Sequence, residues 1–270
     1  MPKPLSELSL EYAQHIEWLL TDVDDTLTWQ GRLPPETLLA LQKLEKVGVK
    51  VVAVTGACAG WCDQIARLWP LHGVIGENGA FWMRKDDNAF HVKHVRDRVR
   101  MKKDQLALYQ AIETLLEEYP EIEFAQDQAF RYCDVAVNLG QDRAPISYGL
   151  KTEIAQRVRA IKVGEYYVNA TLSSIHLNAW VGEHSKRATG EAYLGEYNHG
   201  RLPDLSKLAY VGDSLNDEGM FTWLPTTFGV ANITPVLSQL DSKPTFITER
   251  SGGFGFAQLA DVISQAKSYC

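Results

Sequence analysis

Acidic side chains follow two apolar segments of this sequence that lie far apart along the chain. Asp22 and Asp24 come directly after one apolar run, and Asp213 and Asp217 come after another. If both runs form neighbouring parallel strands, their carboxyl ends meet at the edge of the sheet where such folds bind ligands. Carboxylates crowded in this way repel one another unless a cation is present. Carboxylate oxygens suit Mg²⁺, so we expect these four residues to hold that ion.

Other kinds of site are compatible with parts of this pattern. An aspartate-rich loop after a strand is often an ordinary turn, in which the side chains bond their own backbone. A calcium loop of the EF-hand type requires Gly and Glu where this chain has Leu27 and Leu33, which excludes it. Cys58 and Cys62 would share a helix face, but a zinc site needs two further ligands, and no second Cys/His pair lies close in the sequence.

The apolar pattern predicts an α/β core in two pieces. Continuous apolar runs are typical of buried parallel strands, and apolar residues at helical spacing lie between them. Strand, helix and strand make a βαβ unit near the N-terminus. The expected first piece has strands at 16–20, 49–54, 73–75 and 80–83, with helices at about 38–47 and 60–68. The expected second piece has strands at 208–211, 226–230 and 245–248, with helices at 188–197 and about 256–267.

The segment between these pieces has a different order of elements. It predicts helices at about 106–116 and 146–161, with strands at 122–125, 135–139, 166–172 and 175–180. Such an order is typical of an α+β domain. We therefore predict a Rossmann-like parallel-sheet core formed by residues 1–83 and 186–270, with an inserted α+β cap domain at residues 84–185.

Four motifs occur in a fixed order along the predicted core. Asp22 opens the pattern D-x-D-x-T, Thr55 ends the next strand, Lys186 follows the insert, and Gly212 opens the pattern G-D-x-x-N-D. Together they resemble the motifs of the haloacid dehalogenase superfamily of phosphohydrolases. The insert resembles the larger α+β cap of its second cap class, B subtype. This is subfamily IIB, which contains Cof-type and sucrose-phosphate phosphatases.

The resemblance implies a role for each motif residue. Asp22 would be the nucleophile that becomes an aspartyl phosphate, and Asp24 would be the general acid and base. Thr55 and Lys186 would hold the other phosphoryl oxygens. Relatives hold the metal through the first aspartate side chain, the main-chain oxygen of the second, and the aspartate that corresponds to Asp213. Phosphoryl transfer depends mostly on such positioning and charge stabilisation.

The remaining motif positions leave alternatives open. Asp217 would anchor Lys186 or a metal-bound water, and Asn216 beside it would contact substrate. Arg187 could serve in place of Lys186. Many relatives carry Arg directly after the Thr-Gly pair, whereas this chain has Ala57, so one anion contact is missing.

The predicted cap is expected to choose the substrate. Strand alternation places Ser174, His176 and Asn178 on one face, where they would read sugar hydroxyls or form a solvated sheet face. Gly56 and Asn78 are further candidate substrate contacts, and Asn78 would alternatively shape the hinge towards the cap. Arg131 and Asp134 are weaker candidates.

Composition limits the possible partners. The formal net charge is −7, the sequence pI is about 5.5 and no long run of Lys and Arg occurs, which disfavours nucleic acid. The N-terminal segment lacks a signal-peptide core, and no apolar stretch is long enough for a membrane span, so we expect a cytoplasmic protein. The sequence does not set the oligomeric state. We predict a Mg²⁺-dependent phosphatase acting on a small phosphorylated metabolite, with a sugar phosphate favoured. The motifs do not separate hydrolase from phosphomutase, whereas the intact set of carboxylates argues against a non-catalytic regulator.

Overall fold

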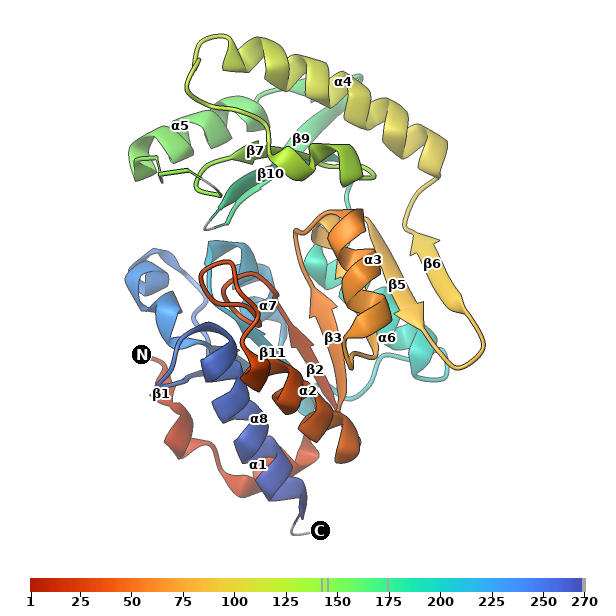
Figure 1. Ribbon diagram of the computed structural model, residues 1–270, viewed down its shortest axis with the longest axis vertical. Coiled ribbons are helices and arrows are strands. Elements are labelled where there is room, and N and C mark those ends of the chain that lie inside the picture. Colours follow the sequence, from red (N-terminus) through yellow and green to blue (C-terminus); the bar gives the residue numbers. More distant parts are fainter. Residues whose placement is uncertain (142, 145, 174, 269–270) are drawn as a thin grey trace.

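The protein divides into a core and a cap (Figure 1). The structure is a computed structural model that describes residues 1–141, 143, 144, 146–173 and 175–268. The core is built on a nine-stranded sheet and the cap on a four-stranded sheet. In these described ranges, no helix combines the length and the apolar content that crossing a bilayer requires.

The core sheet is parallel except at one edge. Its strand order is β1-β13-β12-β11-β2-β3-β4-β5-β6, and only the β4–β5 and β5–β6 pairs among these are antiparallel. The continuous apolar runs of the central strands fit burial on both faces of the sheet. The strands are β1 (Lys3–Pro4), β2 (Trp18–Thr21), β3 (Lys50–Val54), β4 (Gly73–Gly76), β5 (Phe81–Lys85), β6 (Phe90–His94), β11 (Leu208–Gly212), β12 (Thr226–Gly229) and β13 (Phe246–Ile247).

Helices cover both faces of this sheet, as in doubly wound folds. Alternation along β2 directs Leu19 into one apolar cluster, and Trp18 and Leu20 into another. The first cluster is completed by α1 (Leu10–His15), α2 (Pro35–Lys46), α3 (Ala59–Leu68) and α8 (Gly252–Ser268). The second is completed by α6 (Lys186–Tyr197) and α7 (Glu218–Trp223). The predicted α/β core is confirmed.

The cap has its own apolar core, in which two helices pack on an antiparallel sheet. Leu108 and Ile112 of one helix and Ile154 of the other are fully buried against it. The sheet order is β7-β10-β9-β8. The elements are α4 (Arg98–Leu116), β7 (Val135–Asn138), α5 (Tyr148–Arg159), β8 (Lys162–Val163), β9 (Tyr166–Leu172) and β10 (His176–Val181). Figure 1 shows α4 on the side of the cap that faces away from the core.

Two predictions about the insert are wrong in detail. The core sheet does not end before residue 84, because β5 and β6 form an antiparallel extension of it that reaches His94. The predicted strand 122–125 is a loop, in which Phe124 forms an isolated bridge to Val137. Its pairing stops because a 3-10 helix begins at Gln126. The fourth cap strand is instead β8, a two-residue strand.

Candidate active site

The predicted motif strands are direct neighbours in the core sheet. β2 pairs in parallel with β11 on one side and β3 on the other, and Thr21 lies opposite both Val211 and Ala53. Asp22 follows Thr21 directly, and Asp213 and Thr55 each follow two residues after the register partner. Parallel register therefore brings the three motifs together at the carboxyl edge of the sheet.

Lys186 connects two of these motifs through its ammonium group. It lies at the first position of α6, and its side chain is buried. Its Nζ donates to Asp22 Oδ1 at 2.8 Å, to Asp217 Oδ1 at 2.7 Å and to Asn216 Oδ1 at 3.3 Å. The alternative cation, Arg187, lies on the surface and forms an i,i+4 ion pair along its own helix. Lys186, and not Arg187, therefore contacts Asp22 and Asp217, and its role in catalysis stays a prediction.

Asp217 holds the motif loop and the lysine. Its Oδ1 accepts from Lys186 and from the hydroxyl of Tyr210. Its Oδ2 accepts from the backbone N–H groups of Asp213 at 3.0 Å and Ser214 at 3.1 Å. These four bonds use the lone pairs of both oxygens. Asp217 is therefore bound by groups of the chain on both oxygens, and its expected role as a metal ligand stays a prediction.

The chemistry of the remaining carboxylates fits a divalent cation. Ligand atoms of Asp22, Asp213 and Asp217 lie within 4.8 Å of one another. Burial, followed by the charges of Asp217 and Asp22, raises the pKa of Asp213 well above its usual range. Burial also raises the pKa of Asp22 to about 7, although Lys186 opposes this shift. Asp22 and Asp213 are hard oxygen donors whose mutual repulsion Mg²⁺ would relieve.

Asp213 is held in place by two groups from other parts of the core. Thr26, the last residue of the D-x-D-x-T motif, donates to Asp213 Oδ1 at 3.3 Å. The amide of Asn232 donates to Asp213 Oδ2 at 3.0 Å and to the carbonyl of Asp25 at 3.0 Å. Sequence reasoning missed Asn232, whose signal was its place shortly after a predicted strand end.

Asp24 faces the junction between core and cap. It is half-buried and lines two cavities, a small one over Asp22 and an adjoining one of about 640 Å³. Burial, and next the charge of Asp25, raises the pKa of Asp24 to about 6, against the charges of Lys186 and Arg131. A carboxyl group with a pKa near neutrality suits general acid and base catalysis.

The small cavity brings most of the predicted site residues together. Its volume is about 10 Å³, which is roughly the space of one water molecule. Ser174 lies outside the described residues. The cavity is lined by the predicted residues Asp22, Asp24, Thr55, Gly56, His176, Asn178, Asp213 and Asn216, and also by Ser173 and Ser214.

Asn78 lies beside the small cavity and shapes the chain there. It adopts φ 55°, and its N–H donates to the carbonyl of Thr55 at 3.0 Å. The following Gly79 has φ 111°, and a Cβ there would lie 2.4 Å from the carbonyl oxygen of Ser185. The tight turn therefore requires glycine. Within the described residues, the buried amide nitrogen of Asn78 has no hydrogen-bond partner.

The polar face of β10 is buried against the core. His176 Nε2 lies 2.6 Å from Gln141 Oε1. The amide of Asn178 donates to Asp134 Oδ2 at 2.8 Å and to the carbonyl of Gly56 at 3.3 Å. The alternative of a solvated sheet face is thus wrong for these two residues. Their contacts show that Asn178 also joins the cap to the core.

Arg131 makes the second contact to the same core carbonyl. Its guanidinium donates to Gly56 O at 3.1 Å and to both oxygens of Asp134 at 2.9 Å. Two further bonds at 3.1 Å reach Asp127. Arg131 and Asp134 are both buried, so a buried ion pair of the cap contacts the core at Gly56.

Glu77 is the buried residue that sequence reasoning missed most clearly. Its Oε1 accepts from the N–H groups of Ala59 at 3.1 Å and Tyr132 at 2.7 Å. Its Oε2 accepts from those of Cys133 at 2.7 Å and Asp134 at 3.1 Å. A core carboxylate thus fixes three consecutive amides of the cap.

Comparisons with known proteins agree with this geometry. Residues 19–130 match the family model of haloacid dehalogenase-like hydrolases, a range that contains the first two motifs. No curated protein matches the chain. The chain is thus similar to haloacid dehalogenase-like hydrolases over its first two motifs.

Solved structures share the fold over nearly the whole chain. A protein of Thermoplasma acidophilum has 17% identity and a TM-score of 0.66, covering 92% of this chain and 98% of its own. The sucrose-phosphatase of Synechocystis sp. PCC6803, solved with sucrose and phosphate, has 12% identity and a TM-score of 0.62, covering 93% and 98%. The subclass IIB sugar phosphatase BT4131 has 14% identity and a TM-score of 0.55, covering 94% and 98%.

Proposed function

We propose that this protein is a haloacid dehalogenase-like hydrolase, a Mg²⁺-dependent phosphatase that cleaves a small phosphorylated metabolite, with a sugar phosphate as its substrate. The observation that carries the proposal is the contact of Lys186 with both Asp22 and Asp217 at the carboxyl edge of the sheet. It joins three motif segments that are far apart in sequence into one buried charged site. Such a site can bind a phosphoryl group and stabilise its charge.

Asp22 would be the nucleophile. Lys186 holds its Oδ1, and within the described residues no hydrogen bond engages its Oδ2. That oxygen would attack phosphorus and form an aspartyl phosphate, while the bond from phosphorus to the leaving oxygen breaks. Asp24 would give its proton to the leaving oxygen and later take one from the water that hydrolyses the aspartyl phosphate. Thr55 and Lys186 would orient the phosphoryl oxygens.

Asp22 and Asp213 would hold Mg²⁺ with their side chains, together with the main-chain oxygen of Asp24. When bound, the ion offsets the repulsion between carboxylates and phosphate. Asn232 and Thr26 orient Asp213 for this task, since each donates to one of its oxygens. Asp217 would act through Lys186, whose charge and position it maintains.

The leaving group would occupy the adjoining cavity of about 640 Å³. Its lining contains Asp24 and His176, and also Trp61, Gln64 and Gln141. Indole faces and amide groups suit the apolar faces and the hydroxyls of a sugar. The solved neighbours that carry the printed names sucrose-phosphatase and sugar phosphatase also favour this substrate class. We expect a cytoplasmic enzyme that has no nucleic-acid or membrane partner.

Phosphate release from a panel of phosphorylated metabolites tests the proposal. The purified protein should release inorganic phosphate with Mg²⁺, and Asp22→Asn should lower turnover by several powers of ten. Asp87→Asn is the matched control. Asp87 is exposed in the turn between β5 and β6, and it lines neither cavity of the proposed site. Folded Asp22→Asn protein with normal turnover would refute the role of the nucleophile. Isomerised substrate without free phosphate would instead indicate a phosphomutase.

A further inference from the structure

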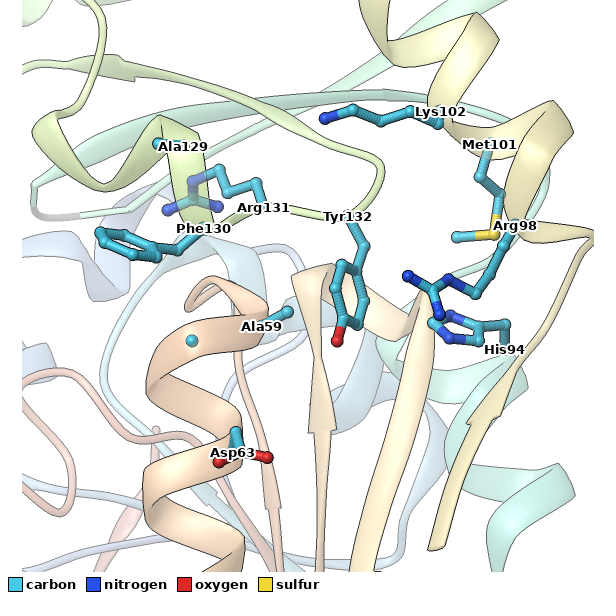
Figure 2. Close-up of a pocket in the computed structure, with 11 residues that line it drawn as sticks. Ala59, Asp63, His94, Arg98, Met101, Lys102, Ala129, Phe130, Arg131 and Tyr132 are labelled. Carbon is cyan, nitrogen blue, oxygen red and sulfur yellow. The ribbon is translucent and has the colours of Figure 1, made fainter.

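A separate cavity lies where the core meets the cap, beside the proposed active site. Its volume is about 610 Å³, and none of the motif aspartates lines it. Figure 2 shows that α3 forms one wall, while the start of α4 and the 3-10 helix Gln126–Phe130 with the residues after it form the others. The lining residues are Ala59, Gly60, Asp63, His94, Arg98, Met101, Lys102, Ala129, Phe130, Arg131 and Tyr132.

Two cations of this cavity lack an acidic partner. Neither Arg98 nor Lys102 forms an ion pair with a carboxylate in the part of the chain that the structure describes. By contrast, their helix neighbour Arg100 pairs with Asp104. Lys102 Nζ donates only to a neutral group, the Gln105 side-chain oxygen at 2.6 Å, among the described residues. Both cations are therefore available for an anion.

The carboxylate of the cavity does not neutralise these cations. Asp63 is held by Arg67, whose guanidinium donates to its two oxygens at 2.8 and 3.0 Å. This i,i+4 pair lies along α3 and cancels the charge of Asp63. The net charge left in the cavity is positive, since Arg131 is likewise paired with Asp127 and Asp134.

Aromatic rings complete the lining. Phe130 is 63% exposed although it packs close to Gly60, so one face of its ring is open. The guanidinium of Arg98 lies 5.2 Å from the centre of the Tyr132 ring. His94 Nδ1 is buried and has no hydrogen-bond partner within the described ranges. A ligand with both a flat ring and a charged group would find partners for each part.

We propose that this cavity binds a small organic phosphate that carries a flat ring, with its charged groups on Arg98 and Lys102 and its ring against Phe130. The site is distinct from the proposed catalytic site and requires no metal. A ligand there contacts α3 of the core and α4 of the cap at the same time. The bound ligand would therefore favour the arrangement in which α3 and α4 lie close together, because the ligand loses contacts when these helices separate.

Calorimetric titration with adenosine 5′-diphosphate tests the proposal on full-length protein freed of metal by dialysis. Without metal, the carboxylates of the catalytic site repel the probe, whereas the cavity keeps its positive charge. We expect saturable binding that weakens with added salt. Arg98→Gln and Lys102→Gln should each weaken it about tenfold, because each removes a charge-assisted hydrogen bond. Phe130→Ala should weaken it by a similar factor.

Lys103→Gln is the matched control. It removes the same charge from an adjacent exposed position of α4 that does not line the cavity. It should leave the affinity within about twofold of the unchanged protein, since Lys103 does not line the cavity and solvent and salt screen its exposed charge. Absence of binding, or equal losses in Lys103→Gln and Arg98→Gln, would overturn the proposal. Phosphate release by Arg98→Gln, measured in parallel with p-nitrophenyl phosphate and Mg²⁺, reports on the proposed catalytic function separately.

Discussion

Glu77 gives the sharpest test of how the core holds the cap. Its two carboxylate oxygens each accept two backbone N–H groups, one from Ala59 and three from consecutive residues that begin at Tyr132. Glu77→Gln keeps the shape but turns one acceptor oxygen into an NH₂ donor. Two buried N–H groups then lose their partner, whichever way the amide is oriented.

The expected loss of stability follows from these two orphaned groups. Each buried, unsatisfied donor costs roughly 1–3 kcal/mol, so Glu77→Gln should lower the free energy of unfolding by about 2–6 kcal/mol. Urea unfolding, followed by circular dichroism, measures this loss. Hydrogen exchange adds a local measurement: the amides of residues 132–134 should exchange faster, because the carboxylate no longer protects them.

Glu113→Gln is the control for this experiment. Glu113 is exposed on α4, and its substitution should change the unfolding free energy by less than about 0.5 kcal/mol. If Glu77→Gln were as stable as Glu113→Gln and the amides of residues 132–134 exchanged at an unchanged rate, the carboxylate would not hold the cap. The two orphaned donors would then cost no measurable free energy of unfolding.

Three further predictions concern the proposed catalytic site. Removing metal with EDTA should stop phosphate release. Added Mg²⁺ should restore it far better than Ca²⁺, whose looser coordination shell misplaces the phosphoryl group. Full activity in metal-free protein would contradict this. Lys186→Met should abolish turnover and destabilise the fold by about 3–5 kcal/mol in urea unfolding, because Asp22 and Asp217 lose their buried partner. Unchanged stability would show that the ion pairs of Lys186 are not buried in solution. The double variant His176→Ala, Asn178→Ala should lower kcat/KM for the natural substrate about tenfold to a hundredfold. Its kcat/KM for p-nitrophenyl phosphate should fall much less. Equal losses on both substrates would assign these residues to cap closure alone.

The motif chemistry could be predicted from the sequence because it depends on short spacings at strand ends. Asp22 and Asp24 are two residues apart, and the distance from Asp213 to Asp217 fits one turn after a strand. The buried apolar runs before them identify the strands, and parallel pairing then brings their ends together. Such predictions require no knowledge of which distant residue lies opposite.

The contacts between core and cap could not be predicted in the same way. Glu77 accepts from amides more than fifty positions away, and an isolated glutamate in a turn gives no sign of them. Asn232 reaches Asp213 from a 3-10 helix that follows β12, and this contact between residues 19 positions apart has no local sequence signal. The short strands β1 and β8 lack the length that makes periodicity readable, and β6 is an edge strand with a largely exposed pattern. Tertiary pairing, not local preference, forms these elements.

The closed arrangement of the cap has a consequence for how the substrate enters. Arg131 and Asn178 both donate to the carbonyl of Gly56, the residue next to Thr55. With these bonds formed, the cavity over Asp22 measures about 10 Å³, too small for a phosphoryl group. The cap must therefore move away from Gly56 before substrate binds and return before the chemistry. Asp127, Arg131 and Asp134 all belong to the insert, so their ion pairs need not break on opening, whereas the backbone bonds of residues 132–134 to Glu77 join the insert to the core. If the segment moves with the cap, opening costs these three bonds to Glu77 as well as the two to Gly56, so we expect Glu77→Gln to make the open state more frequent.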